Sequence, residues 1–151
     1  MQMNDSQRIP ASREKVWAAL NDPEILRQCI PGCQSLEQTA PNEMTATVVF
    51  KVGPVKATFG GRVTLSDLDP PNGYRISGEG SGGVAGFAKG GATVKLTADG
   101  ADATILAYEV DAQIGGKLAQ LGSRLIDSTA KKLAGQFFES FGEVVGSAAV
   151  A

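Results

Sequence analysis

Hydrophobic residues recur at helical spacing near the start of the chain and predict two short helices in tandem. Ser12 is placed to cap the first helix, whose apolar stripe includes Trp17. Asp22-Pro23 ends this helix and starts the second, because an Asp side chain caps free N–H groups and proline fits the first helical position. Pro31-Gly32 ends the second helix, and the mixed segment Asp5 to Ile9 before both is expected to form a short opening strand.

Between Gln34 and Ile114 the hydrophobic period changes to two. Apolar and polar residues alternate in several runs, which are separated by turn sequences such as Gly53-Pro54 and Asp99-Gly100. Such alternation is typical of strands with one buried face and one wet face. Because the connections are short and no helical run interrupts them, we expect the strands to pair as antiparallel hairpins.

After Gly115-Gly116 the helical period returns. Apolar residues fall on one stripe and predict a long helix that starts at Lys117 and ends near Val144 or Val145. A one-sided sheet and a helix with a matching stripe bury each other when the sheet curves around the helix. The predicted fold class is therefore α+β: a curved antiparallel sheet of about seven strands around a long C-terminal helix, with two short helices after the first strand.

The composition is that of a single globular domain. Of the 151 residues, 42% are hydrophobic and 20% are charged, which excludes disorder as the main description. The net charge of -2 gives nucleic-acid binding no electrostatic support. We expect one domain over 1–146 and a short tail over 147–151. The chain shows no signal-peptide pattern and no apolar run of membrane-spanning length, so we expect a cytoplasmic location.

The sequence contains no histidine, the commonest general base near neutral pH and the commonest metal ligand. We therefore predict no catalytic residue, no metal site and no cofactor. The run Gly78–Gly83 matches a dinucleotide-binding pattern, but strand patterns flank it on both sides, whereas that motif requires a following helix. A hairpin or the lip of a cavity is expected there. Without histidine, Cys29 and Cys33 cannot complete a zinc site, and we expect buried thiols, with a redox pair as the alternative.

The chain has 19 glycines, well above the usual share, and many lie within or beside the strand patterns. Glycine allows a sheet to bend, and small inward residues either permit close packing or leave empty volume. We favour an internal apolar cavity between the sheet and the long helix, with Phe87 as its gate. For Tyr108 we put packing in the core first, and a hydrogen bond to a ligand is the alternative. The predicted lining residues are Val48, Phe50, Val63, Leu65, Tyr74, Ile76, Phe87, Val94, Leu96, Tyr108, Leu121 and Leu125.

A set of short motifs occurs in order along nearly the whole chain. These are Asp22-Pro23, Cys29-Ile30-Pro31-Gly32-Cys33, Ser35-Leu36-Glu37, Gly53-Pro54, Phe59-Gly60-Gly61, Gly80, Gly86-Phe87, Gly116-Lys117-Leu118-Ala119 and Phe137-Phe138. Together they resemble the G-subunit family of carbon monoxide dehydrogenase. The resemblance implies the helix-grip fold of START lipid carriers, polyketide cyclases and the major birch-pollen allergen, in which seven strands grip a C-terminal helix around an apolar cavity.

The same resemblance implies an accessory protein of a molybdenum-dependent oxidoreductase of the carbon monoxide dehydrogenase type. It implies a quinone or another lipid as the bound molecule, molybdenum hydroxylase subunits as partners, and peripheral contact with the inner face of the membrane. Many family members continue into a hydrophobic tail, whereas this chain stops at Ala151. Two alternatives stay open: a cyclase or dehydratase-like enzyme that uses Tyr108 or Glu79 as acid or base, and a docking or maturation factor without a ligand.

Overall fold

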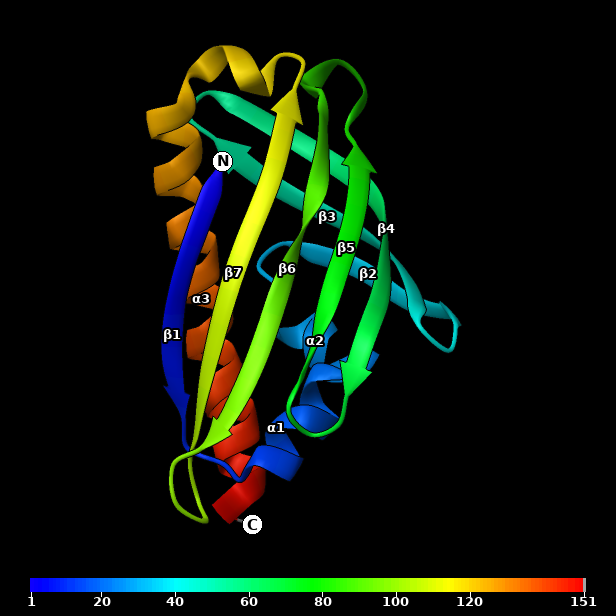
Figure 1. Ribbon diagram of the computed structural model, residues 1–151. Coiled ribbons are helices and arrows are strands. Elements are labelled where there is room, and N and C mark those ends of the chain that lie inside the picture. Colours follow the sequence, from blue (N-terminus) through cyan, green and yellow to red (C-terminus); the bar gives the residue numbers. More distant parts are fainter. Residues whose placement is uncertain (151) are drawn as a thin grey trace.

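The alternating runs of the sequence form strands in the computed structural model, which describes residues 1–150 and the side chains of residues 1–146 (Figure 1). The strands are β1 (Gln2–Ile9), β2 (Cys33–Ala40), β3 (Glu43–Val52), β4 (Val55–Asp69), β5 (Gly73–Ser81), β6 (Phe87–Ala98) and β7 (Thr104–Gly115). The helices are α1 (Arg13–Leu20), α2 (Pro23–Cys29) and α3 (Ser123–Val150), and two short 3-10 turns are η1 (Gly83–Ala85) and η2 (Leu118–Leu121).

The seven strands form one antiparallel sheet in the order β1-β7-β6-β5-β4-β3-β2, which confirms the predicted α+β class. Strands β2 to β7 follow one another as hairpins, as their short connections predict. Strand β1 instead pairs with β7, because α1 and α2 carry the chain to the far edge of the sheet. β1 starts at Gln2, three residues earlier than predicted, because β7 extends far enough to place Asp111 opposite Gln2.

The sheet curls around α3, and β2 and β3 pass behind the front strands in Figure 1. The prediction that the long helix begins at Lys117 is wrong. Gly122, at a φ of +95°, ends the short turn η2, and α3 begins after it at Ser123. A left-handed φ of this kind interrupts a helix although the apolar spacing continues across it. The predicted tail over 147–151 falls largely outside the described residues, since α3 runs to Val150 and neither Ala151 nor the side chains of 147–150 are described.

Helices α1 and α2 begin at the predicted caps. The Oγ of Ser12 accepts a hydrogen bond of 3.4 Å from the backbone N–H of Lys15, and the Oδ1 of Asp22 accepts one of 3.0 Å from the N–H of Glu24. Trp17 on α1 packs against Tyr74 on β5, with ring centroids 5.3 Å apart. The two short helices therefore pack against one end of the sheet and leave its other end to the turns η1 and η2 (Figure 1).

Candidate functional site

Two separate hydrophobic clusters hold the inner face of the sheet, the face toward α3, in place. The larger cluster lies at the α1–α2 end and takes Phe141 and Val145 from the second half of α3. The smaller one lies at the end of η1 and η2 and takes Leu125 from the first turn of α3. The middle of α3, residues 126–136, supplies no residue to either cluster. The helix and the sheet therefore pack together at both ends but not between them.

A cavity of about 350 Å³ lies over the part of the sheet between the clusters. Its wall comes from the middle of β3 to β7, and the apolar residues that line it are Ala46, Val48, Phe59, Val63, Ile76, Ala88, Ala92, Val110 and Ala112, with Gly61, Gly78, Gly80, Gly90 and Gly91 between them. Most of these apolar side chains are only half buried, although they lie on the inner face. An apolar inner wall that the helix does not cover is the geometry of a binding cavity.

Small residues in this wall leave the space above the sheet unfilled. Across four neighbouring strands the register aligns Ala46, Gly61, Gly80 and Ala88 in one row, and Gly78 lies in the next row. A Cβ at Gly78 or Gly80 would come no closer than 3.4 Å to any neighbouring atom, and neither glycine has a positive φ. The backbone therefore does not require glycine at these two positions. What glycine provides there is space above the sheet.

The structure distributes the predicted lining residues among three places. Val48, Val63 and Ile76 line the cavity. The buried core of the larger cluster takes Leu65, Tyr74, Val94, Leu96 and Tyr108. The smaller cluster takes Phe50, Leu121 and Leu125 at its edge. As contacts with a ligand these residues stay predictions.

Phe87, the predicted gate, lies on the other face of the sheet. It is followed on β6 by Ala88 and Gly90, which line the cavity, so the alternation of the strand directs Phe87 to the outer face together with Lys89. Its ring packs over Gly115 and its side chain is 52% exposed. The ring therefore does not border the cavity in this structure. Phe87 faces outward because β6 begins at this residue, and the first, third and fifth residues of β6 point to the outer face.

Tyr108 packs in the core, the interpretation put first for it. Its ring stacks on Phe138 of α3 with centroids 5.1 Å apart, and the residue is 8% exposed. Burial, and to a lesser extent the nearby carboxylate of Asp5, raise the pKa of Tyr108. Glu79, the other residue considered as an acid or base, alternates with Gly78 and Gly80 and therefore points to the outer face, away from the cavity.

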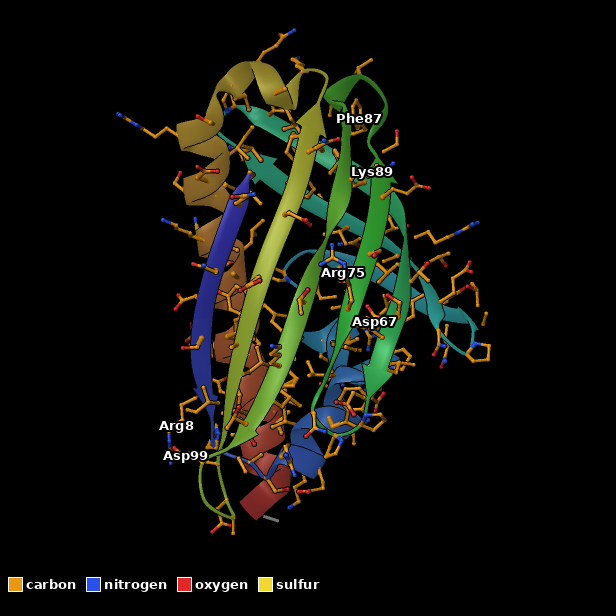
Figure 2. The ribbon with its side chains drawn as sticks, viewed as in Figure 1. Arg8, Asp67, Arg75, Phe87, Lys89 and Asp99 are labelled. Atoms are coloured by element: carbon orange, nitrogen blue, oxygen red, sulfur yellow. The ribbon has the colours of Figure 1, made fainter. Side chains whose placement is uncertain are left out.

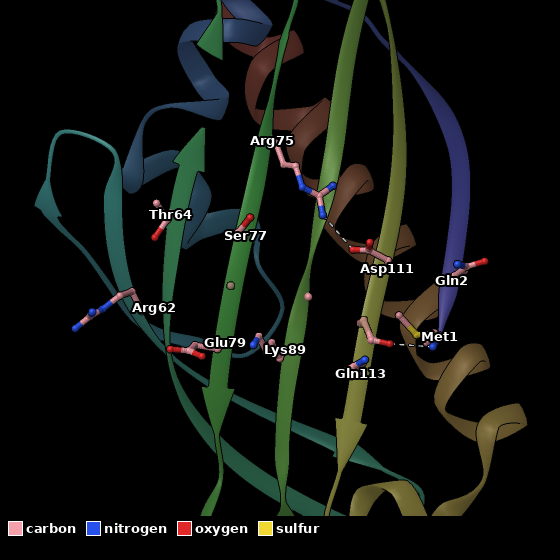
Figure 3. Close-up of a pocket in the computed structure, with 13 residues that line it drawn as sticks. Met1, Gln2, Arg62, Thr64, Arg75, Ser77, Glu79, Lys89, Asp111 and Gln113 are labelled. Atoms are coloured by element: carbon pink, nitrogen blue, oxygen red, sulfur yellow. Dashed lines mark hydrogen bonds and ion pairs between the residues drawn. The ribbon is translucent and has the colours of Figure 1, made fainter. Parts of the chain in front are cut away.

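A second, larger hollow of about 740 Å³ lies on the outer face of the sheet (Figure 3). Two of its arginines form ion pairs, and the first joins the Nε of Arg62 to the Oε1 of Glu43 at 3.2 Å. The register places Glu79 directly between Arg62 on β4 and Lys89 on β6. Arg75 reaches over β6 to Asp111, with 3.3 Å between its Nη2 and the Oδ1 of Asp111. Both arginines of this hollow are engaged by carboxylates and its charges of opposite sign lie side by side, so the apolar cavity is the better candidate site.

The two cysteines are free thiols. Cys29 is buried and Cys33 is half buried, and burial raises the pKa of both. Among the described residues, no group of three or more Cys, Asp and Glu side chains is placed to hold a metal ion. Within the same residues, no helix combines the length and the hydrophobicity that crossing a bilayer requires.

The cavity wall contains smaller side chains than the predicted set of lining residues does. The wall consists mainly of Gly and Ala on the inward phase of the strands, such as Gly78, Gly80 and Ala88. The available signal was the phase itself: a period-two run whose inward members are small marks a wall that no side chain fills. The hollow on the outer face has no such signal, because its residues are ordinary outward polar positions.

Comparisons with known proteins agree with this architecture. The model of the family described as the G-subunit of carbon monoxide dehydrogenase (CoxG) matches residues 6–146. No curated protein matches the sequence. A solved structure of a conserved protein from Geobacillus kaustophilus is 31% identical, with 97% of this chain and 96% of that chain covered and a TM-score of 0.92.

Two more distant structures share the fold. Zhui aromatase/cyclase from Streptomyces sp. R1128 is 12% identical, with 96% of this chain and 93% of that chain covered and a TM-score of 0.70. A START superfamily protein from Mycobacterium smegmatis is 16% identical, with 98% of this chain and 96% of that chain covered and a TM-score of 0.66.

Proposed function

Because the chain belongs to the CoxG family, the G-subunit family of carbon monoxide dehydrogenase, we propose that it binds an apolar small molecule, a quinone or another lipid, in the cavity between the sheet and α3. In this proposal it is an accessory protein of a molybdenum-dependent oxidoreductase of the carbon monoxide dehydrogenase type. It recruits that enzyme to the membrane or delivers its electron acceptor, by contact with the molybdenum hydroxylase subunits and, at its periphery, with the membrane. The observation that carries the proposal is the apolar wall between the two clusters.

The chemistry of the wall selects a neutral, apolar ligand. The side chains that face the cavity are aliphatic or absent apart from the ring of Phe59, and the strand alternation directs charged residues such as Glu79 and Lys89 to the outer face. Burying about ten methylene groups of a ligand contributes roughly 8 kcal/mol before the loss of its motion is subtracted. Because about 8.2 kcal/mol corresponds to a Kd of 1 μM, the remainder corresponds to a Kd well above 1 μM, which suits a carrier that must also release its cargo.

The same wall supports a role without catalysis. General acid–base chemistry needs a titratable group within hydrogen-bond reach of the reacting atoms. Arg62, Glu79, Lys89 and Asp111 border this cavity, but the alternation of their strands directs their side chains to the outer face. The sequence has no histidine. A cyclase or dehydratase would need such a group, so binding and release account better for these residues than catalysis does.

The proposal is tested by filling the cavity. Gly78→Val places a side chain above the wall at a position where a Cβ fits. The matched control is Gly60→Val on the neighbouring strand β4, where a Cβ on the outer face would meet no atom within 4 Å. Binding of decylubiquinone is measured by thermal shift and titration, and solvent extracts of the purified protein are analysed by mass spectrometry for quinones and other lipids.

We expect the wild type and Gly60→Val to bind equally, and Gly78→Val to bind at least about tenfold more weakly while it remains folded. A wild-type protein that carries no lipid and shows no shift with decylubiquinone would overturn the proposal. Equal binding by Gly78→Val would place the ligand elsewhere, outside this cavity. Co-purification of a molybdenum hydroxylase tests the accessory role separately.

A further inference from the structure

Three turns converge at one end of the molecule, opposite α1 and α2 (Figure 1). They are the β3–β4 turn at Gly53-Pro54, η1 and η2, and we call them together the turn end. All three border the smaller hydrophobic cluster, to which η1 contributes Ala85 and η2 contributes Leu118. This cluster lies between the turn end and the cavity and closes the cavity on that side. The turn end is the outer surface of this cluster.

The turn end exposes two large apolar side chains. Val84, at the apex of η1, is 92% exposed and Phe87 is 52% exposed; Figure 2 shows Phe87 at this end. Val84 is held in a closed turn, because the N–H of Gly82 donates to the carbonyl oxygen of Gly86 at 2.9 Å and Ala85 is buried beneath. Apolar side chains that a closed turn holds out to water mark a surface that meets an apolar partner.

The turn end that exposes these two side chains is also positively charged. The segments 51–58, 81–88 and 115–124 build the turn end and contain no Asp or Glu. They carry four cations, all exposed and without an ion pair in the described part of the chain: Lys51, Lys56, Lys117 and Arg124.

Two of these cations repel each other. Lys51 and Lys56 lie directly opposite each other on β3 and β4, and like charges in a cross-strand pair destabilise a sheet. The protein as a whole is slightly acidic, with 16 acidic and 14 basic residues. Its basic end is therefore a local arrangement that an anionic partner would stabilise.

We propose that the turn end docks on an anionic lipid bilayer. Val84 and Phe87 enter the boundary between headgroups and acyl chains, and the four cations lie over the lipid phosphates. A bilayer fits this convex surface better than an acidic protein does, because headgroups rearrange around a protruding side chain, whereas a protein would need a matching pocket. The inference rests on the proposed function in one respect, namely that an apolar cargo is exchanged with a bilayer. Docking by the turn end would bring the smaller cluster, which closes the cavity on that side, against the bilayer.

The test is co-sedimentation with vesicles of phosphatidylcholine, with and without about 30% phosphatidylglycerol, at about 0.1 M and about 0.5 M salt. The variants are Val84→Ser and the pair Lys51→Gln with Lys56→Gln. Matched controls are Leu68→Ser, since Leu68 is a 40% exposed residue near the other end of β4, and Lys95→Gln on the outer face of β6. Melting curves confirm that all variants fold, and decylubiquinone binding is measured without vesicles.

We expect the wild type and both controls to bind the anionic vesicles and to lose them at the higher salt concentration. Val84→Ser and the lysine pair should each bind at least about fivefold more weakly, with unchanged binding of decylubiquinone. The inference would be overturned if the wild-type protein did not bind anionic vesicles, or if the variants bound them as well as the controls do. The first of these results would leave an acidic protein as the partner. Vesicle binding by a protein that binds no quinone would instead refute the proposed function and keep the docking surface.

Discussion

The hydroxyl of Tyr74 donates a hydrogen bond of 3.3 Å to the backbone carbonyl oxygen of Leu20, and so joins the start of β5 to the end of α1. Tyr74 is 4% exposed, and burial raises its pKa far above the ordinary value. The bond closes the core at the end where α1 and α2 cover the sheet. The larger hydrophobic cluster therefore bounds the cavity at this end, and the smaller cluster bounds it at the other.

The raised pKa of Tyr74 predicts how stability depends on pH. A group with a higher pKa in the folded state contributes stability below its unfolded pKa and loses it as the pH rises through the folded value. We therefore expect the free energy of unfolding to fall above about pH 10, by up to about 1.4 kcal/mol per pH unit. Tyr74→Phe lacks this loss but lacks the hydrogen bond as well, so at pH 7 it should be less stable by about 1 kcal/mol.

Urea unfolding followed by the fluorescence of Trp17, the single tryptophan, checks this from pH 7 to alkaline pH. The difference between wild type and Tyr74→Phe should shrink and then change sign as the pH rises. A difference that stays constant would contradict the assignment to Tyr74.

A second buried hydrogen bond fixes β7 to the start of α1. The Oγ1 of Thr104 donates to the carbonyl oxygen of Ala11 at 2.8 Å, and both residues are 0% exposed. Thr104→Val keeps the shape but leaves that carbonyl without its donor, so we expect a loss of about 1–3 kcal/mol in the free energy of unfolding. Thr104→Ser keeps the bond and loses one methyl group, at a cost of about 1 kcal/mol. Equal stability of Thr104→Val and wild type in urea would show that the bond contributes little.

Two glycines of the cavity wall should respond oppositely to alanine. Gly78→Ala should raise the free energy of unfolding by about 0.5–1 kcal/mol, because glycine inside a strand loses more entropy on folding and a Cβ fits there. Gly90→Ala should lower it by about 1–3 kcal/mol, because its Cβ would lie 2.1 Å from the carbonyl oxygen of Asp111. Denaturant midpoints of the two variants test this contrast. A stabilised Gly90→Ala would mean that β6 and β7 move apart easily.

Periodicity alone determined the class of this fold. The alternation of Met44 and Ala46 with Thr45 and Thr47 is a local signal, and so are the caps at Ser12 and Asp22. The structure confirms the elements that they predict. These signals depend on interactions within a few residues, which a sequence records directly. The residue motifs also sufficed to indicate the family, which the family match confirms.

Only the tertiary structure decided where the sheet and α3 are not in contact. The apolar stripe of the last helix continues through Leu121 and Leu125 as one pattern, yet Gly122 divides it, and only the ends of α3 pack. The phase of Phe87 likewise depends on the residue at which β6 joins the sheet. A cavity is volume that distant segments fail to fill, and the distance between two packed layers is set by all of their contacts together. No local pattern records it.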